Sequence, residues 1–312
     1  MSKQNVTLRE IRPEELGRHE PPSGAHESWQ ESWGFIWHDP HRRAGGMNHI
    51  SIQRLRGIAD VWSWVAVNGK VVGKYQNLKL PLPEKDFPSW SLGGQTITTE
   101  SGRRCRVELS YESASADLHY ESHTDPIAFS LDAGGGMSWG SSHYESIGRV
   151  NGTVTANDGA VRVSGFAWQD HSWGPRRWAD VLSHRWLVGE FGPDLFVSAI
   201  RVIRESTPEG LGYGFVYDNG KLHRVEQVTY GSRMSDDGHT PVGCDVRIWT
   251  EGGHGYRVQA DVHLASPSSH LEGFWFTDGL AALECGGRLG SGIFEVQELN
   301  RPAPWHRELS AR

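Results

Sequence analysis

The residue types best suited to acid–base chemistry gather in residues 165–178, GFAWQDHSWGPRRW. Asp170 and His171 are adjacent there, with Trp168 and Trp173 close on either side. A carboxyl group among indoles loses hydration, which favours its protonated form and raises its pKa from about 3.9 toward neutrality. A general acid that works near pH 7 needs such a pKa. Asp170 and His171 are therefore candidate catalytic residues.

The local pattern leaves two interpretations of this pair open. The alternating run before it predicts a strand, and residues 172–175 look like the break where that strand becomes a loop. Neighbouring residues on a strand point to opposite faces, so both side chains reach one cavity only if the chain bends. In the other interpretation Asp170 pairs with Arg176 or Arg177 and holds the loop, while His171 is an ordinary core residue.

A second candidate group lies about one hairpin upstream, in SHYESIGRV. If the intervening strands pair, this segment lies beside Asp170. His143 or Tyr144 could then donate or accept a proton, and Glu145 could orient the histidine. The alternative is ordinary strand surface. We include His143, Tyr144 and Glu145 among the candidate catalytic residues.

Tryptophan is unusually frequent, with 14 residues in the chain. Each indole N–H needs a hydrogen-bond partner, so tryptophan is a costly filler for an ordinary core. The count favours a broad aromatic cavity, and the alternative is a large β core that uses tryptophan for volume. The candidate substrate-binding residues are Trp33, Trp37, Trp139, Trp168, Trp173 and Trp275.

Metal binding is not expected. His38, His41 and His49 are the nearest approach to a ligand set, but Pro40 separates the first two and no acidic third ligand has a clear geometry. The three cysteines are far apart and form no Cys-x-x-Cys pair, which argues against a structural zinc site. Nucleotide-binding, zinc-protease and serine-hydrolase signatures are also absent. We therefore expect an enzyme of this sequence to need no cofactor.

Composition narrows the partners and the compartment. The formal net charge is -7 and no long basic stripe occurs, so nucleic acid is not an expected partner. No apolar run approaches the roughly 18 residues of a membrane span. The polar N-terminus does not resemble a secretory signal, and an odd number of cysteines suits reduced thiols in the cytoplasm. A hydrophobic small molecule is the expected partner, and a homodimer is one assembly to consider.

Alternating segments separated by glycine-rich turns predict an all-β fold. Asn68-Gly69 and Asn219-Gly220 are strong hairpin signals, and no amphipathic helix of 12 or more residues is apparent. A chain of 312 residues with this many strands suggests two β units. We expect an N-terminal arm over residues 1–25, a first domain over residues 26–164 and a second over residues 165–312. The Asp-His pair would then lie near the join, where ligand sites are common.

Three segments carry a resemblance to a known family: WQDHSWG, SHYESIGRVNGTV upstream of it, and GSGIFEVQ near the C-terminus. They resemble the carotenoid 1,2-hydratase (hydroxyneurosporene synthase)-like superfamily of double-lipocalin proteins, which shares its fold with fungal decalin-forming Diels–Alderases. The resemblance covers roughly residues 26–300. The matching positions are Trp168, Asp170, His171, Trp173, Gly174, Gly290, Gly292 and Glu295.

The resemblance implies two lipocalin-like antiparallel barrels or sheets packed together, with a ligand cavity between or within them. It also implies cofactor-independent chemistry on hydrophobic, often isoprenoid or polyene, substrates, including alkene hydration, cyclisation and cycloaddition. Together with the acid–base residues above, it favours an enzyme that protonates an alkene and so brings about hydration, dehydration, isomerisation or cyclisation. The hydratases usually carry an acidic residue where this chain has Ser172, which points away from strict carotenoid hydration. Asp170 would donate the proton, and indoles would stabilise the developing cation. The alternative function is a lipocalin-like carrier, which needs the cavity but no proton donor.

Overall fold

The computed structural model describes residues 6–87, 89–131, 142–156, 159–176, 178–269 and 273–299. Throughout this part of the chain the fold is almost entirely antiparallel β-structure, which confirms the all-β prediction. Its helices there are three short 3₁₀ turns, η1 (Pro13–Glu15), η2 (Arg54–Arg56) and η3 (Trp178–Asp180). None of the described helices has the length and apolar character needed to cross a membrane.

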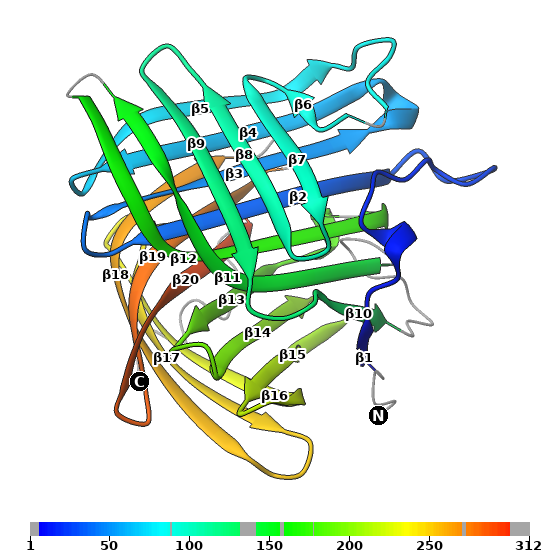
Figure 1. Ribbon diagram of the computed structural model, residues 1–312. Helices are drawn as coiled ribbons and strands as arrows, with labels where there is room; N and C mark the ends of the chain where they lie inside the picture. Colours follow the sequence, from blue (N-terminus) through cyan, green and yellow to red (C-terminus); the bar gives the residue numbers. More distant parts are fainter. Residues whose placement is uncertain are drawn as a thin grey trace.

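The N-terminal half forms one 12-stranded sheet, which occupies the upper part of Figure 1. Its main path runs β5-β4-β3-β2-β12-β11-β9-β8-β7-β6, and β1 and β10 join it through β11. The bounds are β1 (Val6–Glu10), β2 (Trp29–Asp39), β3 (Ala44–Gln53), β4 (Ile58–Val67), β5 (Lys70–Pro81), β6 (Ser91–Leu92), β7 (Gln95–Ser101), β8 (Arg104–Ser110), β9 (Ala114–Ser122), β10 (Ile127–Leu131), β11 (Ser142–Ala156) and β12 (Gly159–Pro175).

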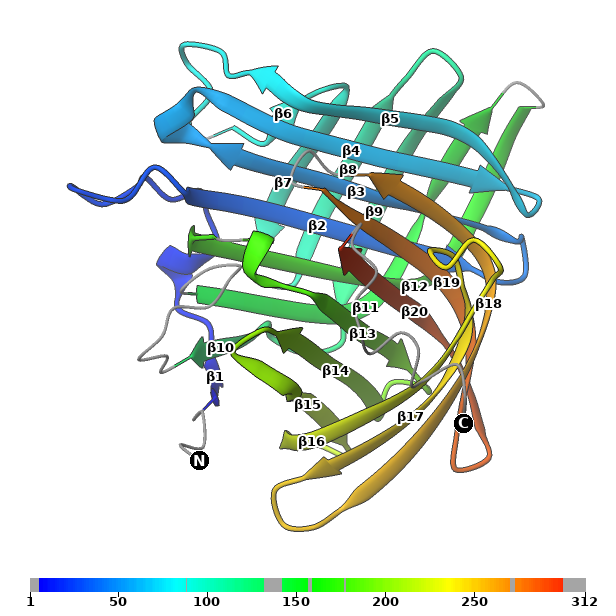
Figure 2. The ribbon, with the colours of Figure 1, turned by 180° about the vertical axis from the view of Figure 1, so that it is seen from behind.

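The C-terminal half is a closed barrel in which the last strand pairs with the first. It lies below the sheet in Figure 1 and, seen from behind, in Figure 2. The bounds are β13 (Ser183–Glu190), β14 (Leu195–Arg204), β15 (Thr207–Asp218), β16 (Lys221–Met234), β17 (Pro241–Thr250), β18 (Gly255–Ser269), β19 (Phe274–Cys285) and β20 (Arg288–Leu299).

Hairpin chemistry in the sequence explains two of the tightest connections. Asn68 and Gly69 both have positive φ, 53° and 75°, and they join β4 to β5. Asn219 and Gly220 do the same between β15 and β16, with φ of 50° and 83°. Two successive residues with positive φ match the twist of the strands that they join, and asparagine and glycine adopt that conformation at least cost.

The apolar side chains of the described residues form three cores. One lies inside the bent N-terminal sheet and includes Trp33, Trp37 and Val107. A second fills the barrel and includes Leu187 and Phe294. The third joins the sheet to the outer wall of the barrel, and its members are Ile36, Met47, Trp62, Trp64, Ala66, Ile127, Phe129, Ile147, Phe166, Trp168, Val181, Val188, Phe196, Ile200, Val202, Tyr213, Phe215, Leu280 and Ile293. Because β2 and β12 contribute to both the first and third cores, they are covered on both faces.

Two organisational details differ from expectation. The segment expected to be a loose N-terminal arm is in fact packed, because β1 pairs with β10 and the side chain of Arg18 is buried against the sheet. Residue 165 lies inside β12, which pairs with β2 and β11 as far as Pro175 and Trp173 respectively. The change from sheet to barrel therefore falls between Pro175 and Ser183, later than the expected boundary.

Candidate active site

An aromatic cavity lies between the N-terminal sheet and the outer wall of the barrel, where the third core is interrupted. Strands β2, β3, β4 and β12 supply one wall, and β13, β19 and β20 supply the facing wall. Its aromatic lining residues are Phe35, Trp62, Phe129, Trp168, Trp178, Trp186, Tyr213, Phe274 and Phe276. Its titratable lining residues are His49, His143, Asp170, Arg176, His184, Asp278 and Glu295. The cavity therefore combines an aromatic surface with several acid–base groups.

Asp170 reaches the cavity from β12 because even-numbered residues of this strand face the barrel. Its side chain is only 13% exposed. Burial raises the pKa of Asp170 to about 6, and the charge of Glu145 acts in the same direction. The nearby positive charges of His143 and Arg176 oppose this change but do not cancel it. With this pKa, about a tenth of the molecules still hold a proton on Asp170 at pH 7, far more than for an ordinary aspartate.

His143 and Glu145 form a hydrogen-bonded group beside Asp170. Glu145 is directly opposite Asp170 in the β11–β12 register. His143 Nε2 lies 3.0 Å from Glu145 Oε1, and its Nδ1 lies 3.8 Å from Asp170 Oδ2. The Trp168 indole N–H donates to the other Glu145 oxygen at 3.0 Å. The glutamate therefore orients the imidazole, and the imidazole is close enough to Asp170 to exchange a proton after a small movement or through water.

The surroundings of Asp170 bear on its two interpretations. Gly34 lies opposite Asp170 on β2, and its backbone N–H hydrogen bonds to the carboxylate. A Cβ atom at Gly34 would collide with Asp170 Oδ1, so only glycine leaves room for this carboxyl orientation. Arg176 donates to Ser32 Oγ at 2.7 Å and to Ser172 Oγ at 2.8 Å. Among the described residues no ion pair joins Arg176 to Asp170, and Arg177 is outside them.

His171 points to the opposite face of β12 from Asp170. The expected bend is missing, because β12 stays paired with β2 through residues 172–175. His171 is fully buried there and packs against Tyr144 with ring centroids 5.1 Å apart. Neither His171 nor Tyr144 lines the cavity. The structure therefore brings together Asp170, His143 and Glu145, and it separates them from the other two candidate catalytic residues.

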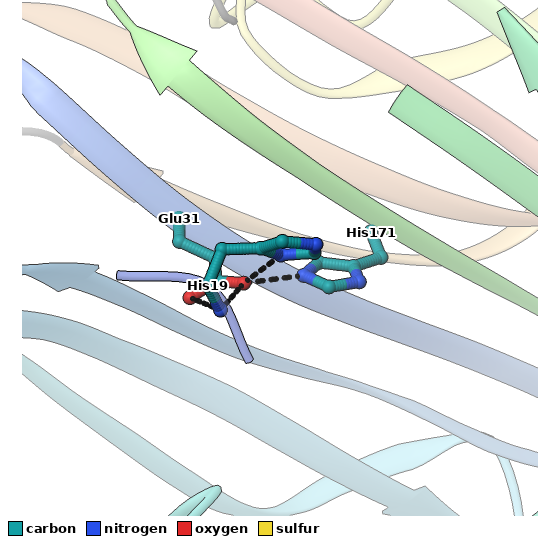
Figure 3. Close-up of side chains that lie close together, drawn as sticks. All are labelled: His19, Glu31 and His171. Carbon is teal, nitrogen blue, oxygen red and sulfur yellow. Dashed lines mark hydrogen bonds and ion pairs between the residues drawn. The ribbon is translucent and has the colours of Figure 1, made fainter. Parts of the chain in front are cut away.

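On this opposite face, Glu31 of β2 lies between His19 and His171 and contacts both (Figure 3). Its Oε1 atom accepts from His19 Nδ1 at 2.8 Å and lies 2.9 Å from His171 Nε2. The buried Arg18 guanidinium donates to Oε2 at 3.0 Å. Burial alone would raise the pKa of Glu31, but the two histidines and Arg18 outweigh it and lower that pKa to about 2. This cluster holds the N-terminal segment on the sheet.

The same three side chains are the one group of at least three potential ligands that the described residues bring together. The ligand atoms of His19, Glu31 and His171 lie within 4.8 Å of one another. His38, His41 and His49, the possible ligands named in the sequence analysis, do not form such a group. His38 bonds Ser291 Oγ at 2.8 Å, His41 is exposed, and His49 stacks on Trp62 in the cavity wall.

The predicted tryptophans are distributed over several environments. Trp168 lines the cavity. Trp33 and Trp37 belong to the core inside the N-terminal sheet, on the other face of β2. Trp173 stacks on His19, and Trp275 stacks on His239, both away from the cavity lining. Trp139 lies outside the described residues. Of the five predicted tryptophans that the structure describes, only Trp168 lines the cavity, so the number of tryptophans in the chain did not identify the cavity lining.

Sequence reasoning missed three indoles and three acid–base groups of the lining. These residues are Trp62, Trp178, Trp186, His184, Asp278 and Glu295. Trp178 is the last residue of the segment 165–178, and Glu295 belongs to the matching segment near the C-terminus, so both carried a sequence signal. Asp278 stands in Thr-Asp-Gly-Leu, which looks like a turn but lies within β19. Its position in the cavity lining depends on how the barrel strands pair, which no local sequence pattern reveals.

The fold is that of a double lipocalin-like β protein with a cavity between its two halves. Residues 12–300 match the family described as Domain of unknown function (DUF7064), and the chain belongs to that family. No curated protein matches the sequence.

Three solved structures share the fold across almost the whole chain. A putative AttH from Nitrosomonas europaea has a TM-score of 0.66 and 13% identity, covering 93% of this chain and 96% of its own. Kievitone hydratase from Nectria haematococca has a TM-score of 0.58 and 12% identity, covering 92% and 90%. CghA with Sch210972 has a TM-score of 0.54 and 12% identity, covering 94% and 98%. These structures confirm the expected resemblance at the level of the fold.

Proposed function

We propose that this protein is an acid–base enzyme that uses its own side chains to convert a hydrophobic, alkene-containing small molecule. The observation that carries the proposal is the buried Asp170, whose pKa is about 6, in an aromatic cavity beside His143. An isoprenoid or polyene suits this lining. The fold shared with a hydratase, at 12% identity, supports enzyme chemistry of this kind without specifying the substrate.

In the proposed reaction the protonated Asp170 carboxyl gives its proton to one alkene carbon. The π electrons form the new C–H bond, and positive charge develops on the neighbouring carbon. Trp168, Trp62 and Trp186 surround the cavity and can stabilise that charge by about 0.5–2 kcal/mol each. Water capture followed by proton loss gives an alcohol. Direct loss of an adjacent proton gives an isomer. Attack by a second alkene closes a ring and moves the charge to another carbon, and proton loss from its neighbour then gives the neutral cyclic product.

His143 restores the proton on Asp170 in this scheme. Its Nδ1 faces Asp170, while Nε2 is held by Glu145, so a proton can pass along a defined direction. Trp168 fixes Glu145 from the other side. Because all three groups lie on one face of β11 and β12, the relay needs no backbone rearrangement.

The function is tested by isotope incorporation. Small molecules extracted from the natively purified protein, together with a panel of apolar terpenoids and polyenes, are incubated with the enzyme in D₂O. Protonation at carbon places deuterium in a C–H bond of the product or of recovered substrate, which mass spectrometry detects. Asp170→Asn should remove this incorporation. Ligands that quench tryptophan fluorescence but never gain deuterium in the wild-type protein would identify a carrier instead.

A further inference from the structure

The barrel wall of the cavity carries its own group of buried acids. Asp278 on β19 and Glu295 on β20 occupy directly opposite positions in an antiparallel pair, which places their Cβ atoms about 4.5–5.5 Å apart. The two residues are 1% and 3% exposed, and both line the cavity. His184 on β13 completes the group, with its Nε2 2.6 Å from Glu295 Oε1. None of these side chains belongs to the Asp170 group on the sheet.

We expect the two carboxyl groups to share a proton. Like charges on neighbouring buried carboxyl groups repel, so one group keeps its proton when the other ionises. Burial raises the pKa of Asp278 and of Glu295 well above the ordinary range, and their mutual repulsion adds to the increase for Asp278. Burial also lowers the pKa of His184 to about 3, so its neutral ring does not supply a compensating charge.

Charged groups on neighbouring strands tune the pair from several directions. Lys74 on β5 favours ionisation of Asp278. The charges of Asp170 and Glu145, across the cavity on β12 and β11, disfavour ionisation of Glu295. The two acid groups therefore influence each other through the space that a ligand would occupy. Loss of a proton from Asp170 makes the barrel pair hold its own proton more strongly.

We propose that Asp278 and Glu295 form a second proton-transfer centre, on the cavity wall facing Asp170, that accepts a proton from the cavity-bound hydrophobic substrate. This inference rests on the proposed function and completes its proton balance. In the fraction of molecules that hold a proton on Asp170 while the pair is singly ionised, Asp170 delivers its proton to an alkene carbon. The pair then removes a proton from an adjacent C–H or from an attacking water. The C–H electrons form the new double bond, or the water oxygen keeps the new C–O bond. The class of substrate is an apolar alkene that spans both walls.

The base is tested with nitrobenzisoxazole, an apolar aromatic probe. A carboxylate removes its ring C–H proton, the C–H electrons form a nitrile, and the N–O bond breaks to give a coloured phenolate. The wild-type pH–rate profile should rise in two steps, one near pH 6 from Asp170 and one at higher pH from the pair. Asp278→Asn combined with Glu295→Gln should remove the upper step, lowering the rate there by about 100-fold. Asp170→Asn should remove only the lower step.

Glu284→Gln is the matched control, because Glu284 is a partly buried carboxyl on the same strand β19 that bonds Gly287 N and does not line the cavity. It should leave both steps unchanged. A wild-type profile without an upper step, or an upper step that survives the double substitution, contradicts the proposal. The wild-type protein could also show the upper step but never incorporate deuterium into alkenes. That result would support the second proton-transfer centre and contradict the proposed function.

Infrared spectroscopy of the wild-type protein gives a second measurement, which does not depend on how well the variants fold. Asp170 should be almost fully ionised at about pH 8, two units above its pKa. The shared proton should then appear as a carboxylic C=O band that persists at that pH and shifts in D₂O. Absence of such a band at about pH 8 contradicts the shared proton and with it the proposed second centre.

Discussion

Asp170 and Glu31 are acidic side chains on the paired strands β12 and β2, yet their pKa values move in opposite directions. Burial raises the pKa of Asp170 to about 6 on the cavity face. On the opposite face, His171, His19 and Arg18 lower the pKa of Glu31 to about 2 despite similar burial. The difference lies in the side-chain partners. Three side-chain nitrogen groups lie at hydrogen-bond distance from Glu31, whereas Asp170 accepts from the Gly34 backbone and has a histidine 3.8 Å away. Burial with close cationic partners fixes structure, whereas burial without them leaves a transferable proton.

The largest expected effect is that of Asp170→Asn on chemistry. The substitution keeps the size of the side chain but removes the transferable proton, so deuterium incorporation should fall by at least about 100-fold. Fluorescence quenching by apolar ligands should remain, because the cavity walls are intact. The melting temperature at pH 7 should stay the same or rise. A parallel loss of stability and activity would instead show that Asp170 is structural.

Glu31→Gln should show the opposite pattern on the other face. The buried Arg18 would lose its closest carboxylate, at a cost of about 3–5 kcal/mol in the free energy of unfolding. Deuterium incorporation per folded molecule should be unchanged well below the melting temperature. Denaturant unfolding measures the first quantity, and Glu20→Gln, at an exposed ion pair with Arg54, is the control with little expected change. Full stability with lost incorporation would place Glu31 in the chemistry.

The pH dependence of the free energy of unfolding should also differ between the Asp170 and Glu31 carboxyl groups. The folded-state pKa of Asp170, about 6, lies above its unfolded value of about 3.9, so folded molecules bind more protons between these pH values. The Asp170 contribution therefore becomes less favourable as pH rises from about 4 to 6, by up to about 3 kcal/mol. The stability gained by Asp170→Asn should grow over that interval. A difference that is constant with pH would show that the pKa is not raised.

For Glu31 the sign is reversed. Its folded-state pKa, about 2, lies below the unfolded value of about 4.3, so its contribution is present above pH 4 and is lost as pH falls toward 2. Glu31→Gln should therefore cost most stability at neutral pH and progressively less in acid. Urea unfolding at a series of pH values measures both variants in one experiment. If the free energy of unfolding changed with pH in the same way for both variants, the two carboxyl groups would not have oppositely shifted pKa values.

Much of this arrangement follows from the sequence, and the rest depends on strand register. Alternation and Asn-Gly turns predicted the β-rich fold, and the indoles around Asp170 predicted its raised pKa. The bend expected at residues 172–175 does not occur, because backbone pairing with β2 outweighs the local turn signals of Gly174 and Pro175. Without the bend, strand alternation sends His171 away from Asp170.

The acids of the barrel wall could not be found from local patterns. Asp278 and Glu295 become neighbours only through the β19–β20 register, and they meet Asp170 only when the barrel packs on the sheet. The same holds for Trp62 and Trp186, which face the cavity from strands at opposite walls. A sequence pattern identifies the face of a strand, but the relative placement of two sheets decides what that face contacts.

Gly34→Ala tests how closely the cavity face is positioned. The added methyl would collide with the Asp170 carboxylate, so the acid must turn or move away. A displacement of about 1 Å can reduce turnover by up to about 100-fold, and we expect a loss within that limit. Gly17→Ala is a suitable control, since a Cβ atom there meets nothing within 4 Å. Unchanged deuterium incorporation in Gly34→Ala would mean that the Asp170 position is not critical.

The smallest effect should be that of metal ions on the His19, Glu31 and His171 cluster. Both histidines already contact the same Glu31 oxygen, and Arg18 bonds the other, so a dication would replace hydrogen bonds and add charge beside a buried guanidinium. Elemental analysis of protein purified without added metal should find no stoichiometric transition metal. Zinc or a chelator should leave the melting temperature and deuterium incorporation unchanged. A stabilisation by zinc that disappears in His19→Ala would show that this face is a metal site and not a hydrogen-bonded anchor.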